Sequence, residues 1–429
     1  MARFLRKRWD SSIAEGLTRR DRKSCDYDCY LPDPLLDRTI RFDGDVAADI
    51  ADAERAIERL DAQASALVNT EALARLLLRA ESVASSRIEG LEIGSRRLLR
   101  AEMARDLGEL HRDVMAEEVL ANIEAMEWSI EEISNETNGH AITVDHILET
   151  HRRLLADTRL TEHAGQIRQE QNWIGGSSYN PCSAAYVPPP PERVGAFLED
   201  LASFCNRDAL PAVAQAAIAH AQFETIHPFV DGNGRVGRAL IHLVLIRRGQ
   251  SRRVLVPVSL ILATWSRDYV EGLTRTRYRG SARSKDAQAG LNQWVAFFSK
   301  ACRRAAEDAL TFEARIVQLQ TGWRERLGRI RSKSAADLLI DRLPGAPIVT
   351  AASAASLIGR SFQSTNEAID RLVDAGILTQ ITLGRRNRAF EVPDVITAFT
   401  ALERRLASPR GDTKVSPPVR KVPHRFRPA

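Results

Sequence analysis

The sequence predicts a mainly helical protein with one small β-hairpin and a C-terminal winged-helix domain. Apolar residues recur at a spacing near 3.6 through most of the chain, which places them on one face of an α-helix. Two stretches depart from this spacing: a Gly-, Ser-, Asn- and Pro-rich segment over 165–190, and a mixed helix and strand segment over 334–403. The 429 residues are 44% apolar and 27% charged, a composition that supports a sizeable core.

Charge, hydropathy and cysteine content exclude several classes of protein. The net charge is +5, with the excess mostly at the two ends of the chain, so charge alone does not indicate nucleic-acid binding. No apolar run reaches the ~18 residues of a membrane span, and residues 1–10 lack the apolar stretch of a secretory signal. We therefore expect a cytoplasmic protein without membrane contact, whose thiols are reduced. Cys25 and Cys29 would need a second pair of ligands to bind a metal, and the sequence has none at ligand spacing.

The N-terminal part divides into a polar segment and a helical region. Residues 1–45 predict an irregular lead-in, because they are polar and are interrupted by Pro32 and Pro34. The N-terminal helical region covers 46–135. Its apolar periodicity predicts helices over 46–69, 71–90, 96–110 and 114–134.

The central region, 136–312, has further helices around the segment 165–190. The periodicity predicts helices over 143–156, 192–206, 211–226, 235–248, 265–276 and 288–312. Within 165–190, two short extended pieces flank a Gly/Ser/Asn/Pro turn, which predicts a hairpin. The prolines that follow end it, because proline cannot continue a ladder or form a helix core.

The C-terminal part is predicted to be a separate domain. After a connecting segment over 313–333, residues 334–403 indicate the element order of a winged helix, with a hairpin tip at Gly384–Asn387. The second helix of this domain has Gln, Asn and Arg side chains that can read bases, but Glu367 and Asp370 would face phosphates. DNA binding and protein docking therefore both stay open. Residues 404–429 are rich in Pro and Arg and predict a disordered basic tail.

The most informative stretch follows the helix that ends at Ile226. Gly232 and Gly234 permit a tight loop that enters a new helix near Arg235. The first amides of a helix are unpaired donors, so a Gly-rich loop at this point forms an anion-binding nest. Asp231 at its rim can hold Mg²⁺ through an oxygen ligand.

Charged side chains in this stretch also favour an anionic ligand. Arg235 and Arg238 lie three residues apart in the first helical turn, where the helix dipole disfavours cations. His227 has a pKa suited to proton transfer near neutrality. Together these groups predict a phosphoryl or nucleotidyl transfer site. The alternative is a structural corner in which the histidine packs and the aspartate caps.

Residues 227–238, His-Pro-Phe-Val-Asp-Gly-Asn-Gly-Arg-Val-Gly-Arg, resemble the signature of the Fic family at every specified position, His-x-Phe-x-Asp/Glu-Gly-Asn-Gly-Arg-x-x-Arg. The preceding segment 220–226 and the segment 165–190 also resemble that family, and the likeness covers about residues 30–310. The Walker pattern of P-loop ATPases is absent from the sequence. The resemblance implies a Fic-type helical core in which 165–190 is a flap that binds a target peptide.

The resemblance implies a protein adenylyltransferase, which moves AMP from ATP onto a Ser, Thr or Tyr hydroxyl of a target protein. It also implies a role for each matched residue. Tyr269 would form a wall of the pocket for the adenine base, and Val270 stands at a position where many members have a second tyrosine. His227 would be the general base, and Asp231 would place Mg²⁺ between the α- and β-phosphates. The anion hole would be Gly232, Asn233 and Gly234, with Arg235 on the inner phosphates and Arg238 on the γ-phosphate.

Residues 85–90 fit a second family pattern, Ser/Thr-x-x-x-Glu-Gly/Asn, from Ser85 through Glu89 to Gly90. The resemblance implies that the helix 71–90 is inhibitory and that Glu89 pairs with Arg238. A glutamate near a helix C-terminus is disfavoured by the dipole, which favours a specific partner. The alternative is a solvated glutamate.

Two other functions stay open at this point. One is a DNA-binding regulator whose Fic core serves as a nucleotide sensor. The other keeps the fold but uses another nucleotide donor or removes AMP. The sequence is also compatible with self-modification and with a homodimer.

Overall fold

Helices build most of the protein, which confirms the predicted fold class. The computed structural model describes residues 1–11, 18–36, 38–66, 70–108, 113–135, 141–383 and 387–406. From the N-terminus to the end of the central region, the helices are α1 Gly44–Ala66, α2 Thr70–Ile88, α3 Ser95–Asp106, α4 Val114–Ser134, α5 Val144–Leu155, α6 Pro191–Cys205, α7 Ala212–Ile226, α8 Asn233–Arg247, α9 Val258–Thr264, α10 Ser266–Arg275 and α11 Lys285–Leu327.

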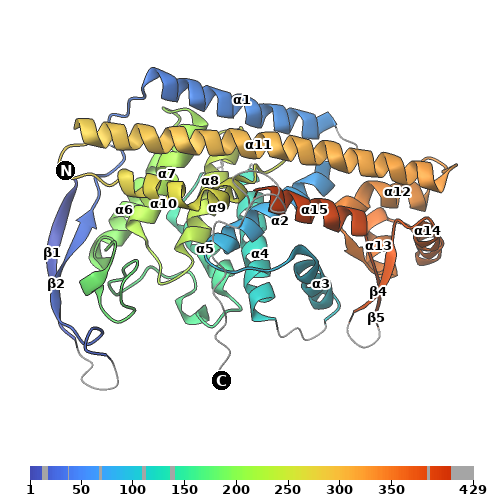
Figure 1. The fold of residues 1–429 in the computed structure, drawn as a ribbon, viewed down its shortest axis with the longest axis horizontal. Coiled ribbons are helices and arrows are strands. Elements are labelled where there is room, and N and C mark those ends of the chain that lie inside the picture. Colours follow the sequence, from blue (N-terminus) through green and yellow to red (C-terminus); the bar gives the residue numbers. More distant parts are fainter. Residues whose placement is uncertain are drawn as a thin grey trace, which may run out of the picture.

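The core is built around α7, whose residues are all buried. Its alanines allow close packing of α8 and α11, and Trp294 of α11 donates a hydrogen bond to the Ala217 carbonyl at 2.8 Å. The helix α11 has 43 residues, about 64 Å at the usual helical rise, and α1 lies along it (Figure 1). This frame holds both ends of the loop between α7 and α8.

The prediction of an irregular lead-in is wrong for two N-terminal stretches, which are β-strands. Arg3–Trp9 (β1) and Cys25–Leu31 (β2) form an antiparallel pair in the register Arg3↔Leu31 to Trp9↔Cys25. The opposite charges of Arg6 and Asp28 face each other across the two strands. Such cross-strand pairs stabilise a sheet. The polar composition of these residues, which predicted a coil, is therefore that of a solvent-facing hairpin.

A disulfide between Cys25 and Cys182 joins this hairpin to the segment 165–190. Trp9 also packs edge-on against Trp173, with ring centroids 5.3 Å apart. The prediction of reduced thiols is therefore wrong for this pair, and it no longer supports the predicted cytoplasmic location. Cys29, Cys205 and Cys302 are free and buried.

The segment 165–190 is less regular than the predicted hairpin. Its extended pieces meet in a single bridge between Ile174 and Tyr186, and Pro181–Ser183 forms a short 3-10 helix. The Asn180 side chain donates to the carbonyls of Arg20 and Asp21. Contacts with the N-terminal hairpin, in place of a long ladder, therefore hold this segment.

The C-terminal part has two differences from the prediction. The helix α11 continues to Leu327, so most of the predicted connecting segment is helical, and a final helix that was not predicted, α15, follows the last strand. The tip residues 384–386 and the predicted tail beyond 406 lie outside the described residues. The elements are α12 Ala335–Arg342, the 3-10 turn η4 Leu343–Gly345, β3 Ile348–Val349, α13 Ala351–Ile358, α14 Phe362–Asp374, β4 Thr379–Leu383, β5 Asn387–Glu391 and α15 Pro393–Leu406.

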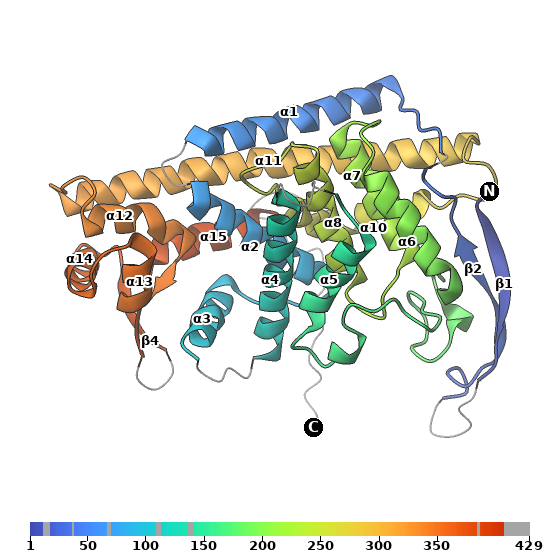
Figure 2. The same cartoon turned by 180° about the vertical axis from the view of Figure 1, so that it is seen from behind.

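These C-terminal elements, here called the C-terminal module, lie at the opposite end of the molecule from the β1–β2 hairpin (Figures 1 and 2). The strand order is β3-β5-β4. The module contacts α2 directly, because Arg79 donates to the Gly345 carbonyl at 2.9 Å. A winged helix remains an interpretation of this element order. No helix in the described part of the chain is long and apolar enough to cross a membrane.

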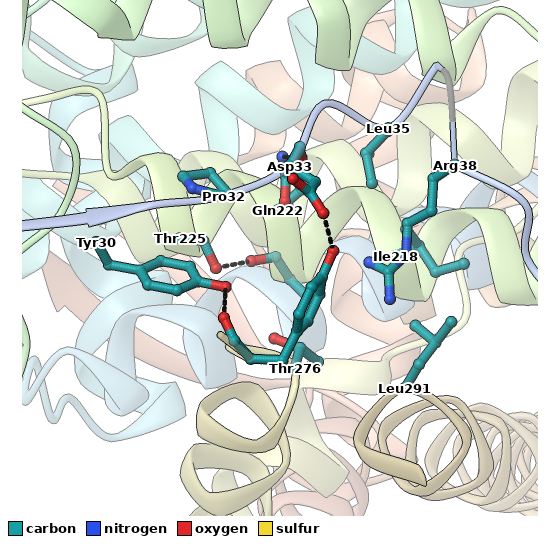
Figure 3. Close-up of a pocket in the computed structure, with 12 residues that line it drawn as sticks. Tyr30, Pro32, Asp33, Leu35, Arg38, Ile218, Gln222, Thr225, Thr276 and Leu291 are labelled. Atoms are coloured by element: carbon teal, nitrogen blue, oxygen red, sulfur yellow. Dashed lines mark hydrogen bonds between the residues drawn. The ribbon is translucent and has the colours of Figure 1, made fainter. Parts of the chain in front are cut away.

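Around a small pocket, hydrogen bonds hold the chain between β2 and α1 in place (Figure 3). The Tyr30 hydroxyl donates to the Tyr278 carbonyl at 2.8 Å, and the Tyr278 hydroxyl donates to Asp33 at 2.6 Å. The cavity of about 20 Å³ is large enough for roughly one water molecule. None of the residues that line it belongs to the loop after α7, and its two hydrogen bonds tie the N-terminal segment to Tyr278.

Candidate active site

The candidate site is the loop that joins α7 to α8. His227 follows the last residue of α7 with a left-handed backbone, φ 50° and ψ 63°, a conformation that is costly for a residue with a side chain. Its carbonyl accepts hydrogen bonds from Arg168 Nε at 2.9 Å and from Asn172 Nδ2 at 3.3 Å. The ring of Phe229 stacks on His151 at 3.7 Å. The loop is therefore held by residues from two other segments of the chain.

The start of α8 has the backbone geometry expected for the predicted anion-binding nest. Gly232 is left-handed, with φ 78°, and Val236 donates the first helical bond, to the Gly232 carbonyl. The amides of residues 233–235 precede that bond and have no intrahelical partner. The Asn233 side chain, in contrast, bonds both the N–H and the carbonyl of Phe229. Asn233 can thus offer its backbone to an anion, while its side chain shapes the loop.

Two buried arginines flank this nest. Arg235 is 4% exposed and Arg238 is 1% exposed. Arg235 Nε and Nη1 have no hydrogen-bond partner among the described residues, and the nearest carboxylate oxygen, of Asp231, lies 3.6 Å from Nη2. A buried guanidinium without a strong partner is unfavourable, so this geometry is suited to an anionic ligand.

Arg238 is occupied by the end of α2. Its Nε donates to Ser85 Oγ at 2.8 Å, and its Nη2 donates to Glu89 Oε1 at 2.8 Å. The Glu89 carboxylate also lies against Gly234, where a Cβ atom would collide with Oε1. The structure thus contains the Glu89–Arg238 pair that the resemblance implies, and it places this carboxylate over the nest itself.

The electrostatics of the site follow from burial and from these charges. Burial lowers the pKa of His227, and the nearby Arg168 and Arg277 lower it further, to about 4. The imidazole is therefore neutral at pH 7 and can accept a proton. Burial raises the pKa of Glu89, but Arg238 and Arg235 outweigh burial and hold this pKa below its usual value. Glu89 is thus a carboxylate at neutral pH.

Asp231 is the residue best placed for a metal. Its side chain is 53% exposed at the rim of the loop, and among the described residues no group of three or more metal-binding side chains exists. Mg²⁺ usually takes one or two carboxylates together with substrate phosphates. A single exposed carboxylate beside an anion nest fits that preference.

Tyr269 lies in the core between α7 and the candidate site, beside Arg238. It is buried, and its hydroxyl lies 2.8 Å from His220 Nε2, so it packs against α7. Val270 is exposed.

Sequence reasoning missed several residues around His227. Arg168 holds the loop carbonyls, and burial raises the pKa of the Glu224 carboxyl, 3.9 Å from His227 Nδ1, to about 7. His151 Nε2 lies 3.1 Å from the Asp231 carbonyl oxygen. In the sequence, each of these residues is only a charged or polar side chain within an apolar or Gly-rich stretch. This pattern does not identify a partner that is distant in sequence.

The comparisons with known proteins agree with this geometry. The model of the Fic/DOC family matches residues 141–245, and the model of the Fic/DOC family N-terminal region matches residues 47–131. The chain is 32% identical to protein adenylyltransferase fic-1 of Caenorhabditis briggsae over 36% of its own length. It is 31% identical to protein adenylyltransferase Fic of Culex quinquefasciatus over 46% of its own length.

These matches are partial. They cover 29% of the Caenorhabditis protein and 39% of the Culex protein, well under half of either relative. Among solved structures, a Fic family protein from Desulfovibrio desulfuricans has the same fold, with a TM-score of 0.50 and 19% identity over 82% of this chain and 97% of that chain. Together with the loop at residues 227–238, the matched models show that the chain contains a Fic/DOC domain over 141–245, preceded by a Fic/DOC N-terminal region over 47–131.

Proposed function

We propose that this protein is an adenylyltransferase that moves AMP from ATP onto a hydroxyl of a target protein. One observation carries the proposal: a neutral histidine, an anion nest and two buried guanidiniums converge on the loop between α7 and α8. Protein adenylyltransferases among the relatives share this region. Each group has the chemistry that a triphosphate and an attacking alcohol require.

The nest would receive the inner phosphates of ATP. The free N–H groups of residues 233–235 project outward from the N-terminal end of α8, where the helix dipole favours negative charge. The unpartnered Nε and Nη1 atoms of Arg235 supply further donors, and Arg238 would reach the γ-phosphate once Glu89 leaves it. Binding then replaces a carboxylate by a phosphate on the same guanidinium.

His227 would accept the proton of the target hydroxyl. The hydroxyl oxygen forms a bond to the α-phosphorus, the bond from that phosphorus to the bridging oxygen breaks, and pyrophosphate leaves. A positioned base contributes typically about 10²–10⁴ in rate. The low pKa of His227 keeps the ring neutral before the step, and positioning of the phosphates supplies much of the remainder.

Asp231 would hold Mg²⁺ together with phosphate oxygens. When bound, the metal would neutralise charge that develops on the leaving pyrophosphate. The Asp231 carboxylate is 53% exposed and lies 3.6 Å from the Arg235 guanidinium, so its affinity for metal without a nucleotide should be weak. Metal and nucleotide would therefore bind together.

The target protein would dock against the segment 165–190. Backbone pairing with an extended peptide explains how a site can accept varied side chains near the modified hydroxyl. Tyr186 in this segment donates a hydrogen bond to the Thr225 carbonyl at 2.7 Å, two residues before His227. A peptide along this segment would thus lie close to the base.

The end of α2 would inhibit the enzyme. Glu89 occupies both Arg238 and the space over Gly234, so ATP in the presence of this carboxylate cannot place its γ-phosphate on Arg238. Removal of the carboxylate should permit the productive pose. This proposal makes the inhibition a competition between two anions for one guanidinium.

The test is incubation of the protein with Mg²⁺ and α-labelled ATP in a cell lysate. Wild-type protein and the variant Glu89→Gly should label proteins, whereas Glu89→Gly combined with His227→Ala should label none and should still bind ATP. His163→Ala is the matched control, because His163 is exposed and lies outside the loop. Labelling at full rate without His227 would refute the proposed base. Loss of label from prelabelled protein would favour the AMP-removing alternative.

A further inference from the structure

Arg168 lies at the start of the segment 165–190 and is 3% exposed. Its guanidinium donates only to backbone carbonyls: from Nε to His227 at 2.9 Å, from Nη1 to Glu170 at 3.1 Å, and from Nη2 to Pro189 and, at 3.5 Å, to Ile226. Its own backbone N–H donates to the next loop carbonyl, at position 228, at 3.0 Å. One side chain thus joins three pieces of chain: the entry of the flap, its exit and the catalytic loop.

This cation has no carboxylate partner among the ion pairs of the described residues. Burial accordingly lowers the pKa of Arg168, to about 10, and the carbonyl dipoles supply its compensation. A buried charge is retained at such a position only where the surrounding groups are fixed around it. An apolar residue could fill the volume but could not donate hydrogen bonds to these four carbonyls.

The backbone conformation of His227 explains why this residue needs the hydrogen bond from Arg168. A left-handed backbone at a non-glycine residue is unfavourable by itself, and it persists where surrounding contacts fix it. The His227 carbonyl accepts bonds from Arg168 and Asn172, both from the flap. The position of the imidazole therefore depends on how the flap is seated.

We propose that Arg168 is the positioning residue for His227, fixing its backbone and coupling the seat of the target-binding flap to the catalytic base. Arg168 acts through His227 and makes no contact with substrate. This inference rests on the proposed function for its consequence in catalysis, while its structural part stands on the carbonyl contacts alone. It predicts that a change at Arg168 alters the base and the flap together.

The charges that face His227 make the inference testable through the pKa of His227. Burial, Arg168 and Arg277 lower the pKa of His227, and Glu89 opposes them. The carboxyl of Glu224 lies 3.9 Å from Nδ1. Removal of the Arg168 charge should therefore raise the pKa of His227. A lysine at this position keeps the charge, so it separates this electrostatic effect from the loss of the carbonyl bonds.

The experiment compares Arg168→Met with Arg168→Lys. The His227 pKa is measured by NMR titration of the protein labelled with [¹³C]histidine, with His227→Ala to assign the signal. Arg168→Met should raise this pKa by about one unit, whereas Arg168→Lys should keep it close to the wild-type value. Arg193→Met, which removes an exposed charge from the neighbouring α6, is the matched control and should change nothing.

Activity is measured in the Glu89→Gly background as a function of pH. Arg168→Met should lower kcat by about 10²-fold, the usual effect of a base displaced by about 1 Å, and should shift the acidic limb of the profile upward. Arg168→Lys should recover part of kcat without that shift. Amide hydrogen exchange in 226–229 and in the flap should rise in both variants.

Four results bear on the inference. An unchanged His227 pKa in Arg168→Met, or full activity and unchanged exchange in Arg168→Lys, would overturn it. If Arg168→Met does not fold, Arg168→Lys alone decides, because it keeps the charge and loses the planar set of bonds. If no variant transfers AMP, including the Glu89→Gly parent, the proposed function fails, and the titration and the exchange still decide the role of Arg168.

Discussion

Replacement of Glu89 by glycine should release the enzyme from inhibition. The carboxylate holds Arg238, which is 1% exposed, through a charge-assisted bond of 2.8 Å. Such contacts contribute about 1.5–3 kcal/mol, and because Glu89 itself is 37% exposed, the lower part of that range applies. A competing anion on Arg238 should then gain about 10–30-fold in occupancy, at about 1.4 kcal/mol per factor of ten.

The assay is the initial rate of AMP transfer from α-labelled ATP at an ATP concentration below saturation. Glu89→Gly should be faster than wild type by about 10–30-fold, and Glu89→Gln should lie between them because it keeps the size and removes the charge. Glu92→Gln is the control, because Glu92 is exposed and lies only two residues beyond Gly90, whereas Arg238 donates hydrogen bonds to Ser85 and Glu89. An unchanged or lower rate in both Glu89 variants would refute the competition between the two anions.

Three other predictions follow from the fold. Alkylation of the unfolded, unreduced protein should modify three thiols, and five after reduction, because one disulfide links the hairpin to the flap; five in both cases would exclude it. The free energy of unfolding should fall by roughly 3–4 kcal/mol from pH 7 to pH 5. Protonation of the native Glu224 carboxyl, whose pKa burial raises to about 7, offsets about 2 kcal/mol of a loss of about 5–6 kcal/mol. That loss arises because the unfolded chain protonates near pH 6.5 three imidazoles that stay neutral in the native state. These are His151, His220 and His227, whose burial lowers their pKa values to about 4, 3 and 4; urea titrations at the two pH values measure the difference, and equal values would contradict it. Gly345→Ala should destabilise the protein by about 1–3 kcal/mol, because the new Cβ would lie 2.7 Å from Ala72 Cα, whereas Gly322→Ala, with open space around it, should not.

The sequence predicted the helical class and the loop well because both depend on short-range spacing. The periodicity of apolar residues defines one face of each helix, and the residues from His227 to Arg238 form one loop and one helical turn. The pairing of Glu89 with Arg238, in contrast, spans 149 residues. Only the family resemblance indicated that pair.

Contacts between distant segments explain most of what was missed. The hairpin of β1 and β2 has alternating charges that pair across the strands, so its residues resemble those of a polar coil until the partner strand is known. The disulfide joins cysteines 157 residues apart, and spacing alone cannot predict such a pair. Arg168 bonds the His227 carbonyl across 59 residues, and nothing near Arg168 in the sequence identifies that carbonyl as its partner.

The fate of the α-phosphate tests the central claim most directly. The Glu89→Gly protein, incubated with Mg²⁺ and ATP labelled at either the α- or the γ-phosphate, should attach the α-label to protein and release the γ-label as pyrophosphate. Intact mass spectrometry of the modified protein should show the added mass of one adenylyl group per site. Retention of the γ-label on protein, or label from neither position, would contradict the account.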